Sequence, residues 1–172
     1  MIMRPGKELL LPVRPSFIWA TLTLALFANM LPLGRLPWQP DLLALTLVFW
    51  SVHQPLRVGI ATAFLFGLVM DVHQTALLGQ HALSYTALSY FAITVHRRLL
   101  WFTVPSQAMQ VLPLFGSAHA IELAVRLVAG GTFPGWTLVL APVIEAVLWP
   151  VVSVILLAPQ RRAIDPDKNR PL

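Results

Sequence analysis

Two apolar segments joined by a short polar turn lie between Pro37 and Tyr90, and they constrain the fold more than any other feature. The turn reads H-Q-P-L-R at positions 53–57. Asp41 opens the first segment and Asp71 closes the second. If the two segments are antiparallel helices that cross a membrane, both carboxylates lie at the same membrane face. The rest of the chain can be placed relative to this hairpin.

The composition assigns the chain to the membrane. Hydrophobic residues make up 57% of its 172 residues and charged residues only 11%, whereas soluble proteins carry about 25% charged residues. Within a bilayer, backbone polar groups must be paired in helices or in a closed barrel. Barrel strands alternate polar and apolar residues, but these segments are apolar on all sides. We therefore expect an all-α membrane protein.

The apolar segments predict a single membrane domain over residues 15–158. A basic N-terminal segment, 1–14, precedes it, and a polar tail, 159–172, follows it. The first apolar run is long enough to cross a bilayer and lacks a clear cleavage site, so we interpret it as a retained span. The prediction is a compact bundle of six transmembrane helices, at about 15–33, 41–52, 56–72, 80–95, 102–128 and 136–158. The second of these is short for a crossing.

The basic residues predict the orientation of this bundle. Placing the N-terminus in the cytoplasm leaves only Arg35 and Arg126 of the 12 Lys and Arg residues on the opposite side. By the positive-inside rule, both termini are then cytoplasmic, and Asp41 and Asp71 face the periplasm. The residues expected to anchor this topology are Arg57, Arg97, Arg98, Arg161 and Arg162. The two arginine pairs among them are also able to attract anionic lipid or an acidic partner.

Aromatic residues are expected to mark the membrane surfaces. Tryptophan favours the headgroup level of a bilayer, and most of the six tryptophans fall near the ends of the predicted spans. Trp50 and Trp149 are included in this expectation, with Trp19, Trp38, Trp101 and Trp136.

Several classes of function lack support in the sequence. There is no cysteine, and the patterns G-x-x-x-x-G-K-[ST], H-E-x-x-H and G-x-S-x-G do not occur. The basic residues form no stripe with interleaved aromatics, so we do not expect nucleic-acid binding. A metal site formed by Asp71, His73 and His81 is conceivable by ligand type, but helix geometry does not fix the spacing of these residues. The prediction is a protein without catalytic residues, cofactor or metal.

Two aspartates are candidate polar sites. Asp41 precedes a predicted helix and is explained as a cap on the free amides of that helix. Asp71 ends the next span, where a carboxylate opposes the helix dipole. It is either an interfacial residue that reaches water or a group that makes a structural hydrogen bond or contacts a partner.

The last two spans contain four further polar candidates. Glu122 and Arg126 are four residues apart, on one face of a helix. Mutual neutralisation inside the bundle is the simplest account, and a site for a charged ligand or partner is the alternative. Glu145 has no opposite charge near it in sequence, so it must be neutral, reached by water, or paired with Arg126 or His119. It is the best candidate for a functional polar group, whereas His119 is expected to hydrogen-bond between helices.

The order and spacing of several motifs resemble those of the rod shape-determining protein MreD family. These motifs are P-x-x-P-D-L-L at 37–43, F-W at 49–50, P-L-R-V-G at 55–59, G-L-V-M-D at 67–71 and L-G-x-x-A-L at 78–83. The six-span frame of about 170 residues agrees with this family. The last two spans resemble it mainly in hydropathy and in L-W-P at 148–150.

The resemblance implies a non-catalytic scaffold in the inner membrane of bacteria. Proteins of this family pair with the bitopic protein MreC and work with MreB filaments and cell-wall synthases to set rod shape. Their fold is also similar to that of the substrate-binding membrane subunits of vitamin transporters. The alternative function is therefore small-molecule binding in a central cavity lined by His119, Glu122, Arg126 and Glu145.

Overall fold

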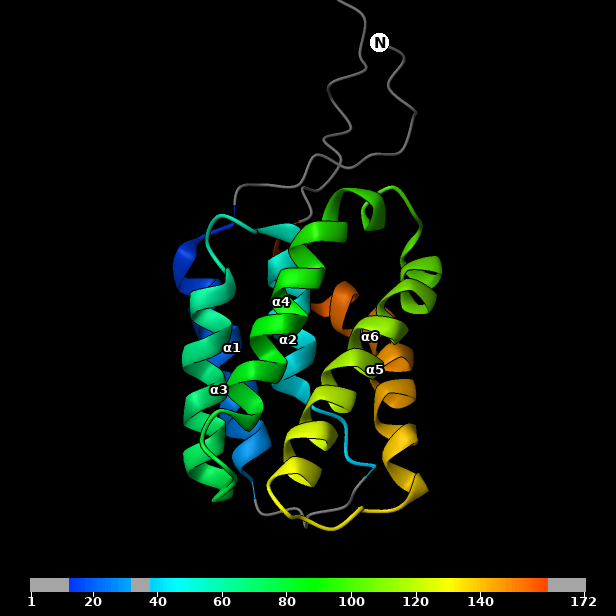
Figure 1. Ribbon diagram of the computed structural model, residues 1–172. Coiled ribbons are helices and arrows are strands. Elements are labelled where there is room, and N and C mark those ends of the chain that lie inside the picture. Colours follow the sequence, from blue (N-terminus) through cyan, green and yellow to red (C-terminus); the bar gives the residue numbers. More distant parts are fainter. Residues whose placement is uncertain (1–12, 32–37, 161–172) are drawn as a thin grey trace, which may run out of the picture.

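The computed structural model describes residues 13–31 and 38–160, and these residues form helices and connecting turns without a strand. Figure 1 shows a bundle of six α-helices, which agrees with the six helical segments expected from the sequence. The helices are α1 (Pro15–Met30), α2 (Leu42–His53), α3 (Ile60–Gln74), α4 (Gln80–Leu99), α5 (Val104–Val128) and α6 (Leu140–Leu157). Two short 3-10 helices, η1 (Trp136–Val139) and η2 (Ala158–Gln160), flank α6.

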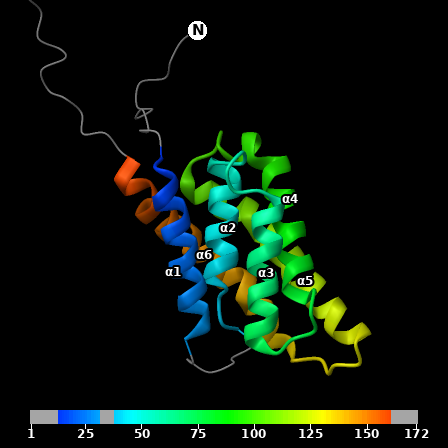
Figure 2. The same cartoon turned by 90° about the vertical axis from the view of Figure 1, so that its left-hand side faces the viewer.

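Successive helices run in opposite directions, so the turns gather at two ends of the bundle (Figures 1 and 2). One end holds the start of α1, the α2–α3 turn and the α4–α5 turn. We call it the basic end, because Arg14, Arg57, Arg97 and Arg98 lie there. The other, which we call the acidic end, holds the start of α2, the α3–α4 turn and the α5–α6 loop. Asp41, Asp71, Glu122 and Glu145 lie toward it.

The shortest of the six helices forms the centre of the bundle. Helix α2 has 12 residues, or about 18 Å at 1.5 Å per residue, against a hydrocarbon core of about 30 Å. Every residue from 43 to 52 is buried, because α1, α4 and α6 all pack against this helix. Figure 1 shows that α2 begins inside the bundle and does not reach the acidic end. Its first turn therefore needs polar partners from other helices.

Two tryptophans lie in the core, contrary to the expected interfacial positions. Trp50 and Trp149 are fully buried. The indole of Trp50 donates to Thr21 at 2.9 Å, and that of Trp149 donates to Gln107 at 3.1 Å. A partner for the indole N–H on another helix makes burial of the whole ring favourable. The other four tryptophans, Trp19, Trp38, Trp101 and Trp136, are exposed.

Helices α3 and α4 pack closely, and one glycine permits their approach. A Cβ atom added to Gly67 would lie 2.4 Å from the Cα of Ala82 on α4. No side chain fits at that distance, so the two backbones touch at this point. Small residues at such crossings are typical of helices that pack within membranes.

The outer surfaces of the helices are apolar. Leu65 on α3, Met109 on α5 and Val147 on α6 are each more than half exposed. Helix α5 and the segment Trp136–Gln160 are long and apolar enough to cross a membrane, whereas α1, α2 and α3 are shorter apolar helices. The structure thus provides an all-helical bundle with two candidate spans of full length.

Candidate functional site

The start of α2 lies in a partly buried network of polar side chains that we call the polar cluster: Asn29, Asp41, Ser84, Tyr85, His119, Glu122 and Glu145. Asp41 is its centre. The Asp41 carboxylate accepts hydrogen bonds from the backbone N–H of Ala44 at 2.8 Å, from the side-chain amide of Asn29 at 2.6 Å and from the hydroxyl of Tyr85. Asp41 is therefore the N-cap of α2, as expected from the sequence, and also joins α1 and α4.

Glu145 on α6 completes the cap of α2. Its Oε1 atom accepts the backbone N–H of Asp41 at 2.9 Å and lies 2.9 Å from Nε2 of His119 on α5. The side chain is fully buried. A carboxylate in such a place is costly unless hydrogen bonds compensate for the lost hydration. Of the two partners considered for Glu145, Arg126 and His119, the structure selects His119.

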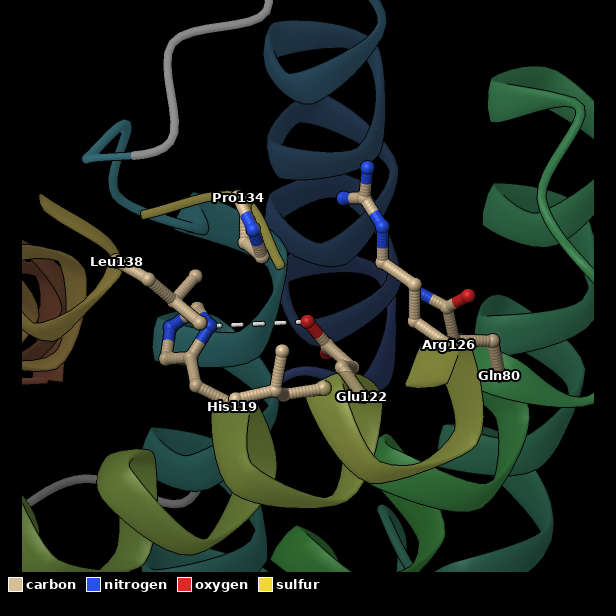
Figure 3. A pocket seen from close by; sticks show the side chains of 7 residues that line it. Gln80, His119, Glu122, Arg126, Pro134 and Leu138 are labelled. Carbon is tan, nitrogen blue, oxygen red and sulfur yellow. Dashed lines mark ion pairs between the residues drawn. The ribbon is translucent and has the colours of Figure 1, made fainter. Parts of the chain in front are cut away.

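Glu122 pairs with His119 and not with Arg126, so the expected pair of charges four residues apart is wrong. Nδ1 of His119 lies 3.6 Å from Oε2 of Glu122, and Ser84 donates to Oε1 of Glu122 at 2.8 Å. Arg126 is exposed and makes no ion pair within the described part of the chain. Figure 3 shows its guanidinium directed away from Glu122. Residues four apart on a helix are neighbours. The direction of each side chain, however, depends on its contacts with α4 and α6.

His119 therefore lies between two carboxylates on neighbouring helices. One ring nitrogen faces Glu145 and the other faces Glu122. The expected role of this histidine, a hydrogen bond between helices, agrees with this geometry. A ring that meets an acid on each side offsets part of the cost of burying both.

Asp71 is a fully buried cap for the helix that follows it. Its carboxylate accepts the backbone N–H groups of Gly79 at 2.8 Å, His81 at 2.7 Å and Ala82 at 3.3 Å, and it meets Nδ1 of His81 at 2.8 Å. Gly79 has a φ of 103°, which a residue with a side chain rarely adopts. Asp71 thus opposes the dipole of its own helix but binds the free amides at the start of α4, where a negative charge is favourable. Of the two roles expected for Asp71, the geometry supports the structural hydrogen bond and not the interfacial residue that reaches water.

A small cavity lies beside the polar cluster. Its volume is about 60 Å³, and its lining includes His119, Glu122, Arg126 and Pro134 (Figure 3). Glu145 is not part of the lining. This volume holds a few water molecules, whereas sites for small molecules are usually about 300–1,000 Å³. The cavity does not support the alternative function of binding a vitamin-sized ligand.

The polar side chains of the cluster and of its surroundings contact other helices or their own backbone. Among residues 13–31 and 38–160, no three His, Asp or Glu side chains are grouped so that they could hold a metal ion. His73 is exposed, away from the buried pair formed by Asp71 and His81. The hydroxyl of Ser117 donates to the backbone of its own helix at Leu114. The polar groups are used to bind helices to one another.

Three members of the polar cluster were not expected from the sequence. Asn29, Ser84 and Tyr85 are hydrogen-bonding residues within apolar segments, and each lies toward the acidic end of its helix. Burial of such groups without a partner is costly. In an antiparallel bundle these three residues lie at the same depth as Asp41 and Glu145. This shared depth could have identified them from the sequence.

The residues expected to anchor the topology are exposed where the structure describes them. Arg57 lies in the α2–α3 turn and donates to the backbone oxygen of Val13 at 2.7 Å. Arg97 and Arg98 lie in the last turn of α4. Arg161 and Arg162 lie outside the described residues.

Comparison with known proteins gives the family. The chain matches the family described as rod shape-determining protein MreD over residues 11–158. It is 26% identical to the rod shape-determining protein MreD of Haemophilus influenzae over 129 residues, which are 73% of this chain and 77% of that protein. No solved structure matches the chain. Because the family match spans most of the sequence, the chain belongs to the rod shape-determining protein MreD family.

Proposed function

We propose that this protein is a non-catalytic scaffold in the bacterial inner membrane that joins parts of the cell-wall elongation complex and helps to maintain rod cell shape. The family match over residues 11–158 carries this proposal, because it supports a role in rod shape determination. The family is not a known enzyme family. The polar cluster is also consistent with a scaffold, since its groups are used in hydrogen bonds between helices.

The proposed placement is a multi-pass bundle over residues 15–158 with both termini in the cytoplasm. The separation of charge between the two ends supports it. Arg14, Arg57, Arg97 and Arg98 lie at the basic end, which the positive-inside rule assigns to the cytoplasm. The acidic end, with the polar cluster and Asp71, would then face the periplasm.

The proposed partner is an MreC-like bitopic protein, with MreB filaments and cell-wall synthases in the larger complex. Association in a bilayer depends on close packing of helices and a few polar contacts. Exposed apolar side chains such as Leu65, Met109 and Val147 offer surfaces on three helices where a partner's transmembrane helix can pack. The mechanism would be docking of that helix onto a rigid bundle.

The polar residues would contribute to this function mainly by keeping the bundle rigid. Asp41, His119, Glu122 and Glu145 tie together the helices around α2, and Asp71 fixes the α3–α4 turn. Arg126 differs from them, because it is an exposed charge beside the cavity.

Site-specific crosslinking tests the docking mechanism. A photoreactive amino acid is placed at position 65, 109 or 147, each on the outer surface of a different helix. We expect capture of an MreC-like protein from one of these positions in native membranes and much weaker capture from the others. Docking on the surface of the bundle would be contradicted if the photoreactive residue crosslinked only to lipid at every outward position. This comparison is made in cells whose rod shape depends on the protein.

A further inference from the structure

The basic end of the bundle carries exposed positive charge without any carboxylate to balance it among the described residues. Four arginines are exposed there: Arg14, Arg57, Arg97 and Arg98. All four carboxylates that the structure describes lie toward the acidic end. The only ion pairs in the described ranges involve histidines at that acidic end. Within the described ranges, no carboxylate contacts these arginines.

The α4–α5 turn places two of these arginines next to exposed aromatic side chains. Arg97 and Arg98 occupy the last turn of α4. Trp101 follows three residues later and is 88% exposed, and Phe102 is 44% exposed. Exposure of an indole or a phenyl ring to water is unfavourable, and the indole is stable at the level of lipid headgroups.

The α2–α3 turn repeats this combination at the same end. Leu56 is completely exposed at the tip of the turn, directly before Arg57. The Arg57 side chain donates to the backbone oxygen of Val13, which fixes the turn beside the start of α1. Two separate turns thus present an apolar side chain and an arginine together. A membrane interface satisfies both kinds of group at once.

We propose that the basic end is a binding surface for anionic phospholipid headgroups, with Arg97 and Arg98 as its main phosphate contacts. A guanidinium matches the geometry of a phosphate and can bind it with two parallel hydrogen bonds. The apolar neighbours decide between a lipid and an acidic soluble protein. Trp101 and Leu56 extend beyond the helix ends, where they can enter the boundary between headgroups and acyl chains.

Lipid retention by the purified protein tests this surface. The protein in mild detergent is mixed with equal amounts of phosphatidylglycerol and phosphatidylcholine, and bound lipids are counted by native mass spectrometry. The wild type is expected to retain about 25-fold more phosphatidylglycerol, since two arginines contribute about 1 kcal/mol each. Arg97→Gln and Arg98→Gln should each lower this preference about fivefold, since one arginine near an anionic surface contributes about 1 kcal/mol. Inorganic phosphate at millimolar concentration should not displace the lipid.

Arg126→Gln is the matched control, because it removes an exposed arginine at the acidic end. It should leave the preference unchanged. Arg97→Lys with Arg98→Lys keeps the charge and should retain most of the preference, while Trp101→Ala should weaken binding of both lipids without changing their ratio. Equal retention of both lipids by the wild type, or an equal loss in Arg126→Gln, would overturn the proposal. Unchanged lipid preference in the Gln variants with loss of a co-purifying cytoplasmic protein would instead assign the arginines to an acidic protein.

Discussion

Asp41 and Glu145 are joined across 104 residues of sequence by a hydrogen bond of 2.9 Å from the backbone N–H of Asp41 to Oε1 of Glu145. This contact fastens the start of α2 to α6. Because α2 begins inside the bundle, its first amides find acceptors on other helices. The carboxylate on α6 supplies the acceptor that the short helix lacks.

The first prediction concerns this acceptor. Glu145→Leu should lower the free energy of unfolding by about 3 kcal/mol, because it leaves the N–H of Asp41 and Nε2 of His119 without a partner. Glu145→Gln keeps a carbonyl oxygen and should cost clearly less. Chemical unfolding in detergent, followed by the fluorescence of the six tryptophans, measures both changes. Equal losses in the two variants would show that the hydrogen bonds to Oε1 do not hold α2.

The second prediction concerns the cap on α4. Asp71→Ala should destabilise the protein by about 3 kcal/mol, since three backbone N–H groups lose a charged acceptor in a buried place. His73→Ala, two residues away on the same helix, is the control, because His73 is exposed. It should change the unfolding free energy by less than about 0.5 kcal/mol. The same unfolding measurement applies, and a small effect of Asp71→Ala would contradict its role as a cap.

The third prediction separates two glycines within helices. Gly67→Ala should be strongly destabilising, because the new methyl group would overlap the backbone of Ala82. Gly116→Ala should be neutral or stabilising by up to about 1 kcal/mol, since nothing lies within 4 Å of its added Cβ and alanine favours a helix. Thermal unfolding of both purified variants provides the comparison. Similar melting temperatures would mean that α3 and α4 are not in contact at Gly67.

The fourth prediction tests the pairing of Glu122. A double-mutant cycle of Glu122→Gln with His119→Gln should give a coupling energy of about 1 kcal/mol, as expected for side chains in contact. The cycle of Glu122→Gln with Arg126→Gln should give a value near zero. Unfolding free energies of the single and double variants provide both numbers. A larger coupling with Arg126 would restore the pair that the sequence suggested.

These contrasts show which parts of the structure follow from the sequence. The helices could be predicted because each apolar run has clear polar or proline boundaries, and the cap at Asp41 follows from its place before such a run. The pairing of Glu122 could not, because spacing along α5 carries no information about Ser84 on α4 or Glu145 on α6. The burial of Trp50 was missed for the same reason, since its partner Thr21 lies on another helix. Contacts between helices depend on their relative rotation, which one sequence does not specify.

Affinity purification of this protein from its own membranes tests the proposal that it is a scaffold of the wall-elongation complex. The tagged protein is extracted in a mild detergent, and bound proteins are identified by mass spectrometry. We expect recovery of an MreC-like protein together with cell-wall synthases. Asp71→Ala, adjusted to equal expression, should recover less of them if the rigid α3–α4 turn supports the interface. Recovery of an ATPase with an energy-coupling subunit, without any wall-synthesis protein, would contradict the scaffold and favour transport.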